Sequence, residues 1–150
     1  GDGWVRLPDG TRRWGRYGAA GLLLYSLHPD GTPHVLLQHR AAETDGGGTW
    51  AFPGGALDRD ESPREAAFRE FSEEVTGDLG EPELIGTHAE DLTLWRYDTF
   101  LAYVPDLPTL TPKGRESSEL RWVPAAEATT LPLHPALRNA WPHLHEQITA

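Results

Sequence analysis

Short apolar runs separated by turn residues dominate the chain, and their pattern predicts a protein built mainly of β-strands. Residues 18–27 form a continuous apolar run that suits a central strand buried on both faces. The His-Pro-Asp-Gly sequence at residues 28–31 is typical of a turn and leads into the next strand. Other strands are predicted at residues 34–40, 49–52, 83–88, 92–104 and 119–123, and the fourth of these is long enough to be split in two.

The beginning of the chain has the pattern of a β-hairpin. Residues 4–7 and 11–14 flank Pro-Asp-Gly at positions 8–10, a sequence that favours a tight turn. Two longer stretches are interpreted as loops, because turn-forming residues dominate them. They are residues 41–48, which end in three glycines, and the proline-rich residues 105–112.

The strongest helix signal begins at Ser62. This residue is a candidate N-cap, Pro63 suits the first helical position, and Glu65 completes a capping box. Apolar residues recur every four positions and predict a buried stripe; they are Ala67, Phe71 and Val75. We expect the helix to end at Gly77, because glycine tolerates the backbone conformation that commonly terminates helices.

A second helix is predicted at the C-terminal end of the sequence. Residues 124–128 suggest a helical turn, and residues 135–148 a helix that Pro142 should break or kink. Strands therefore dominate, with one helix among them and another after them. This order predicts an α/β architecture in which helices cover a mixed sheet.

Composition narrows the classes of protein to consider. The chain has 150 residues, 38% of them apolar, which suits a single domain spanning residues 1–150. The 13 basic and 23 acidic residues give a net charge of −10, which disfavours a nucleic-acid polymer as partner. No apolar run approaches the roughly 20 residues of a membrane-spanning helix. Cysteine is absent, which excludes disulfides and thiol catalysis and fits a cytoplasmic location.

The first helix carries an unusual acidic cluster. Glu70, Glu73 and Glu74 stand at positions i, i+3 and i+4, so we expect all three on one face, opposite the apolar stripe. Their mutual repulsion needs a cation, which Arg64 and Arg69 can supply on a solvated helix face. The other candidate is a hard divalent ion such as Mg²⁺, because such ions prefer clusters of oxygen ligands.

The segment from Gly55 to Gly77, GALDRDESPREAAFREFSEEVTG, resembles the signature of the Nudix hydrolases, G-x5-E-x7-R-E-U-x-E-E-x-G-U, where U is a bulky aliphatic residue. The residues in register are Gly55, Glu61, Arg69, Glu70, Phe71, Glu73 and Glu74. One departure is Thr76 in place of the last signature glycine, with Gly77 one position later. The resemblance implies the Nudix fold, a mixed β-sheet sandwiched between helices (α-β-α), here with an N-terminal β-hairpin.

The resemblance also implies a chemistry, the hydrolysis of nucleoside diphosphate derivatives with Mg²⁺ or Mn²⁺ as cofactor. The three glutamates then correspond to the metal ligands, together with the carbonyl of Gly54, and Glu70 or Glu74 is an alternative candidate for the general base. Arg69 corresponds to the residue that orients the glutamates, and Glu61 to a support for the loop. Arg40 corresponds to a phosphate-binding arginine, with His39 as the alternative.

Segments outside the signature resemble actinobacterial MutT-type 8-oxo-dGTP diphosphatases; they include GRYGAAGLLL, HPDGTP, LLQHRA, RESSELRWVP and LPLHPAL. The implied reaction converts a small-molecule nucleoside triphosphate to a monophosphate and pyrophosphate. Glu119 is the candidate reader of the nucleobase; Glu116 is the alternative, and also a candidate metal ligand. A flat slot for the base is expected from the aromatic residues Trp50, Phe52, Trp95 and Tyr97. Other substrates (ADP-ribose, nucleotide sugars, dinucleoside polyphosphates), a catalytically silent sensor, and a monomer or homodimer remain open alternatives.

Overall fold

A mixed β-sheet forms the centre of the molecule in the computed structural model, which describes residues 2–43, 47–115 and 117–149. Its strands run in the order β11-β4-β3-β9-β8, with the short β5 beside β4 and β6 beside β3. β3 and β9 are parallel, and the other pairs are antiparallel. The strands are β3 (Ala19–Leu27), β4 (Pro33–Arg40), β5 (Trp50–Ala51), β6 (Gly54–Ala56), β8 (Glu83–Asp91), β9 (Arg96–Tyr103) and β11 (Ser117–Pro124).

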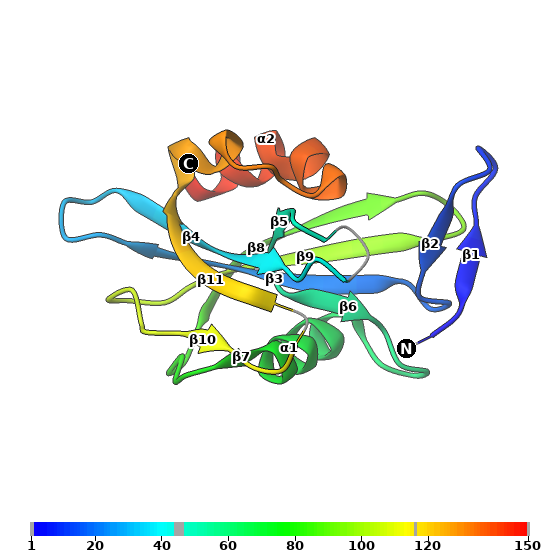
Figure 1. Cartoon of the computed structure of the whole chain (residues 1–150), viewed down its shortest axis with the longest axis horizontal. Coiled ribbons are helices and arrows are strands. Elements are labelled where there is room, and N and C mark those ends of the chain that lie inside the picture. The colour runs from blue at the N-terminus through cyan, green and yellow to red at the C-terminus, as the bar shows by residue number, and fades with distance from the viewer. Residues whose placement is uncertain (1, 44–46, 116, 150) are drawn as a thin grey trace.

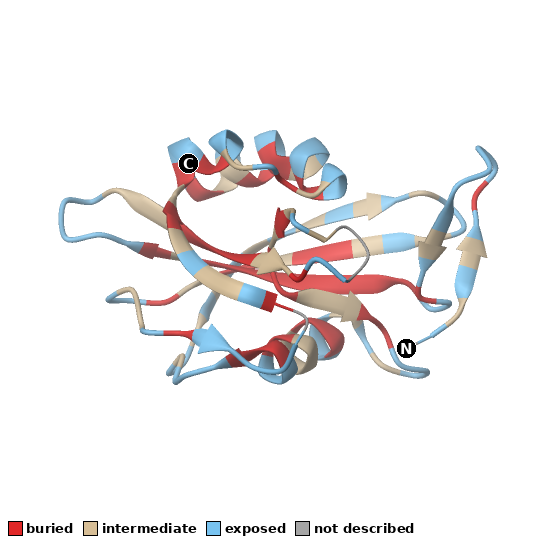
Figure 2. Cartoon of the chain, in the orientation of Figure 1, coloured by how far each residue is buried: buried red, intermediate tan, exposed pale blue. Residues whose placement is uncertain are grey.

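Helices cover both faces of this sheet, which confirms the expected α-β-α layers. α1 (Pro63–Glu74) lies on one face and α2 (Pro135–Thr149) on the other, after a 3-10 helix, η1 (Ala125–Thr130) (Figure 1). Burial is concentrated in the middle strands and on the inward sides of both helices (Figure 2). Alternate residues of β3 supply the two cores: Leu23 packs in the α2 layer, and Leu22 and Leu24 pack in the α1 layer. Within the described residues, no helix is both long and apolar enough to cross a bilayer.

Two small pairs of strands lie outside the main sheet. The predicted N-terminal hairpin is confirmed as β1 (Trp4–Arg6) and β2 (Arg12–Trp14), and the rings of Trp4 and Trp14 meet edge to face at 5.1 Å. The second pair consists of β7 (Val75–Thr76) and β10 (Thr111–Pro112). β10 falls within the segment that the sequence analysis interpreted as a loop, because a two-residue strand leaves no periodic pattern.

The start of α1 follows the prediction, but its end does not. Ser62 and Glu65 form the complete capping box. The helix ends at Glu74, since Val75 is already extended (φ −129°) and Thr76 pairs with Thr111. Gly77 therefore does not terminate the helix. It follows β7 at φ +141°, where a Cβ atom would lie 2.6 Å from Leu110 Cδ2.

Two further local features differ from the expectations. The strand predicted at residues 49–52 is shorter, since β5 spans only Trp50–Ala51, and Gly54 and Gly55 belong to a further strand, β6, where they pair with Gly21 and Ala20 of β3. Of the break or kink expected at Pro142, the break does not occur: α2 continues as one helix from Pro135 to Thr149. The helix tolerates this proline because buried residues anchor it on both sides of position 142; they are Leu137, Trp141, Leu144 and Ile148.

Candidate active site

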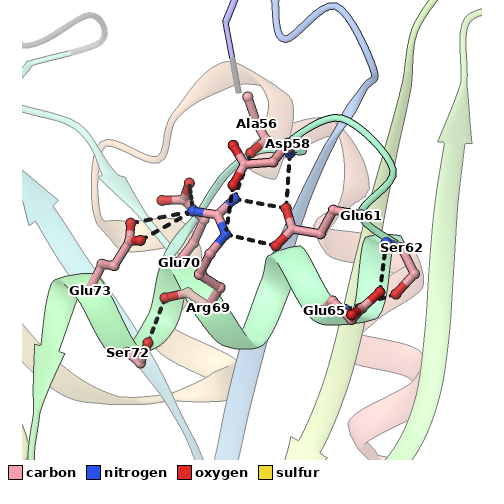
Figure 3. Close-up of polar contacts among 9 residues, drawn as sticks. All are labelled: Ala56, Asp58, Glu61, Ser62, Glu65, Arg69, Glu70, Ser72 and Glu73. Atoms are coloured by element: carbon pink, nitrogen blue, oxygen red, sulfur yellow. Dashed lines mark hydrogen bonds and ion pairs between the residues drawn. The ribbon is translucent and has the colours of Figure 1, made fainter.

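Arg69 joins α1 to the loop that precedes it. Its guanidinium donates two hydrogen bonds to Glu61, at 2.7 and 2.9 Å, and one to the carbonyl of Ala56 at 3.1 Å (Figure 3). On the other side it donates to Glu70 at 3.0 Å and to Glu73 at 3.3 Å. These acceptors raise the pKa of Arg69 despite its partial burial. Arg69 therefore remains positively charged, and it holds two of the three clustered glutamates in place.

Glu61 is placed to fix the loop. Its Oε1 also accepts the backbone N–H of Asp58 at 2.9 Å, and its side chain is only 13% exposed. The hydrogen bonds from Arg69 are the main cause of its lowered pKa, which means that the carboxylate stays ionised well below neutral pH. The bidentate pair thus connects the loop to the middle of α1.

The carboxylate of Glu70 lies directly against the backbone of β6. A Cβ atom added to Gly55 would come so close to the carboxyl carbon of Glu70 that the carboxylate would have to move. Gly55 therefore provides the space in which Glu70 sits. The side chain of Glu70 is 15% exposed, so burial and Arg69 together restrict where it points.

The three glutamates line one cavity, but Glu74 does not lie opposite the apolar stripe as expected. Glu73 is 56% exposed in its side chain, whereas Glu74 is only 5% exposed and is buried along with Ala66, Ala67 and Phe71. Position 74 follows Phe71 by three residues, so its side chain lies at the edge of the apolar stripe and not opposite it. A buried carboxylate at this position is costly unless cations or donors compensate it.

Tyr97 of β9 lies beneath the same region. Its hydroxyl occupies the space above two glycines: a Cβ atom would approach it to 2.3 Å at Gly21 and to 2.6 Å at Gly54. Burial raises the pKa of Tyr97, the charge of Glu74 raises it further, and the charge of Arg40 lowers it. Tyr97 was assigned to a base slot in the sequence analysis; its hydroxyl is also close enough to Glu74 and Arg40 to be affected by their charges.

A cavity of about 140 Å³ opens beside the glutamates. It is lined by Glu70, Glu73, Glu74, Lys113, Gly114 and Arg115. Sequence reasoning missed Lys113 and Arg115, which come from the connection between β10 and β11. One signal could have drawn attention to this segment: Lys113 is the single lysine of the chain.

The donor set fits a hard divalent cation. The carboxylates at the cavity offer only oxygen ligands, the type that Mg²⁺ and Mn²⁺ prefer. In the structure, no three His, Asp or Glu side chains among the described residues converge closely enough to hold an ion. Glu70 and Glu73 instead accept hydrogen bonds from Arg69. Glu70, Glu73 and Glu74 are the residues that would hold a metal, while the part expected of the Gly54 carbonyl stays a prediction.

Two residues expected to contact the base, Glu119 of β11 and Trp50 of β5, form a second group with His39 of β4, the alternative phosphate-binding residue. Glu119 Oε2 forms an ion pair with Arg121 Nη2 at 2.9 Å, and the guanidinium carbon of Arg121 lies 4.8 Å from the centre of the Trp50 ring. His39 stacks on Trp50 at the same separation of 4.8 Å and contacts Ser118 at 2.8 Å. Trp50 is 5% exposed, so its neighbours present the accessible planar surfaces here.

Other predicted site residues have different surroundings. Trp95 contacts the N-terminal hairpin, donating from Nε1 to the carbonyl of Trp14 at 3.3 Å, and its ring lies 6.0 Å from that of Tyr97. Arg40 stands at the end of β4, where its backbone pairs with that of Ser117 on β11. Glu116 lies outside the described residues.

Comparison with known proteins decides the family. The NUDIX domain profile matches residues 17–144. The chain belongs to the Nudix family. The protein is thus a Nudix hydrolase, an enzyme of the pyrophosphohydrolase type, whose family uses divalent metal cations and acts on small nucleotide substrates.

Similar proteins support the same family. This Nudix hydrolase is 48% identical over 153 residues to a Mycobacterium tuberculosis protein named "Putative 8-oxo-dGTP diphosphatase 3", an alignment that covers 96% of this chain and 69% of that protein. It is 40% identical to a nucleoside triphosphate pyrophosphatase/Nudix hydrolase fusion protein of Bifidobacterium longum, covering 95% of this chain and 30% of the fusion. The crystal structure of the Nudix hydrolase RenU from Mycobacterium smegmatis superposes with a TM-score of 0.89 at 42% identity, over 97% of this chain and 94% of that one.

Proposed function

We propose that this Nudix hydrolase cleaves 8-oxo-dGTP to 8-oxo-dGMP and pyrophosphate with Mg²⁺, or Mn²⁺ in its place, and so cleanses the cytoplasmic nucleotide pool before polymerases use it. The observation that carries this proposal is the complete acidic cluster, held by Arg69 and Glu61, beside a cavity that both carboxylates and cations line. The name of the mycobacterial relative supports the choice of substrate.

In this reaction a water oxygen forms a bond to the β-phosphorus, and the bond from that phosphorus to the oxygen shared with the α-phosphate breaks. The products are the nucleoside monophosphate, pyrophosphate and one proton. A divalent ion, when bound by the glutamates, neutralises phosphate charge and acidifies water. Glu70 or Glu74 takes the proton from the attacking water, and Arg69 keeps Glu70 and Glu73 oriented.

Substrate binding uses residues on β4 and β11. Arg40 carries a charge that acts on Tyr97 beside the cluster, which suits a role toward the phosphates. Glu119 reads the base by accepting hydrogen bonds from ring N–H groups, and the paired Arg121 offers a flat surface over Trp50. Glu116 is the alternative base-reading residue.

The decisive experiment compares kcat/KM for 8-oxo-dGTP and dGTP at saturating Mg²⁺, with the products identified by chromatography. We expect a preference of more than about tenfold, which corresponds to at least ~1.4 kcal/mol of base-specific transition-state binding. Glu119→Ala should reduce this preference while Glu74→Gln should lose most of kcat for both nucleotides with the fold retained. Equal rates for the two nucleotides would reject 8-oxo-dGTP and direct the search to ADP-ribose and nucleotide sugars, and near-normal activity of Glu74→Gln would reject the site assignment.

A further inference from the structure

The C-terminal end of α1 is bound to the β10–β11 connection. Val75 and Thr76, directly after the helix, pair with Pro112 and Thr111, and β7 and β10 lie together beside this end of α1 (Figure 1). The backbone N–H of Lys113 then donates to the carbonyl of Glu74 at 2.8 Å. The connection therefore has a fixed position relative to the acidic cluster, and its residues Lys113, Gly114 and Arg115 line the cavity.

Lys113 has donors to spare at that position. Its Nζ donates to the carbonyl of Ser72 at 3.3 Å, a long contact with the last turn of the helix. An ammonium group has three N–H donors, so two are available for another acceptor. Among the described residues, no carboxylate lies within ion-pair distance of Lys113 or of Arg115, although both line a cavity with three glutamates.

This arrangement suits an anionic ligand. If the glutamates hold a metal ion, their charge is compensated, and a phosphate chain bound in the cavity would carry negative charge that other cations can complement. Lys113 and Arg115, which line the same small cavity as the glutamates, are such cations. We propose that Lys113, assisted by Arg115, binds the polyphosphate chain of the substrate, a conclusion that rests on the triphosphate hydrolysis proposed above but not on the identity of the base.

The sequence allows a selective chemical test, because Lys113 is the single lysine. The intact protein is treated with an amine-acylating reagent, and acylation of residue 113 is measured by peptide mass spectrometry with and without pyrophosphate and Mg²⁺. We expect pyrophosphate with Mg²⁺ to slow acylation of Lys113 several-fold, while Mg²⁺ alone does not. An acylation rate unaffected by pyrophosphate would overturn the proposal.

Variants separate phosphate binding from a purely structural role at the end of the helix. Lys113→Met should raise the inhibition constant of pyrophosphate and lower kcat/KM for dGTP by about tenfold, ~1.4 kcal/mol in binding, with Tm almost unchanged. Lys113→Arg should recover a large part of both. Arg64→Met is the matched control, because it removes one positive charge from the exposed first turn of the same helix.

Three outcomes contradict the proposal. The pyrophosphate inhibition constant and kcat/KM are unchanged in Lys113→Met, they change equally in Arg64→Met, or Lys113→Met lowers only the Tm. Failure of the substrate assignment would look different. An enzyme that prefers another nucleotide would still show the Lys113 effects with that nucleotide and with pyrophosphate. Calorimetric binding of pyrophosphate with Mg²⁺ provides the same test even without turnover.

Discussion

At the scale of single residues, the site depends on a glycine as much as on its charged groups. Gly55 has no side chain, and the carboxylate of Glu70 occupies the space where a Cβ atom would be. The backbone of Gly55 is not in the left-handed region, so alanine is permitted there by its dihedral angles. The requirement for glycine therefore comes from the neighbouring carboxylate, and it protects the position of Glu70.

Gly55→Ala should consequently remove most of the catalytic activity and leave the fold intact. The new methyl group forces Glu70 out of its position and away from Arg69, so we expect kcat to fall by about two orders of magnitude. Steady-state kinetics with a Tm measurement checks this. Activity close to that of the unmodified enzyme would show that the position of Glu70 is not critical.

At the scale of elements, the active-site helix is held by contacts at both ends. At its N-terminal side, Glu61 joins the loop to Arg69 by charged hydrogen bonds that are largely shielded from solvent. At its C-terminal end, the pairing of β7 with β10 takes over from the helix. The helix is thus attached to the preceding loop through Arg69 and to β10 through β7, which limits its movement relative to the sheet.

The Glu61–Arg69 pair should make stability depend on acid pH. Because the pKa of Glu61 is lowered in the folded state, its contribution is fully present above its ordinary pKa of 4.5 and is lost as the pH falls through the lowered value. Glu61→Gln should cost about 2 kcal/mol at neutral pH and flatten the decrease in Tm under acid conditions. Glu146→Gln, an exposed change on α2, is the control. A Tm profile identical to that of the unmodified protein would contradict this role.

At the scale of the whole molecule, the two faces of the sheet carry separate hydrophobic cores. α1 brings the glutamates to one face, and α2 with η1 closes the core on the other, where Leu144 and Ala128 are completely buried. Because α1 packs in the other core, we expect loss of packing beneath α2 to leave the acidic cluster in place, provided that the protein remains folded.

Leu144→Ala should destabilise the fold by about 2–5 kcal/mol, because it leaves a cavity in a closed core. The specific activity of the folded fraction should remain near normal. Denaturant unfolding combined with kinetics measures both quantities. Leu94→Ala is the matched control, since Leu94 is 57% exposed and its truncation should change stability little. Equal losses in the two variants would show that α2 packing does not determine stability.

The sequence by itself determined the local structure and most of the catalytic signature. The capping box at Ser62, the buried run of β3 and the spacing of the glutamates are local patterns, and local patterns are readable because they reflect the periods of helices and strands. Only the tertiary structure decided where α1 ends, since its last turn gives way to pairing with β10, a partner more than thirty residues away. The burial of Glu74, the placement of Glu70 on Gly55 and the approach of Lys113 to the cavity likewise depend on contacts between segments distant in sequence, which no local period encodes.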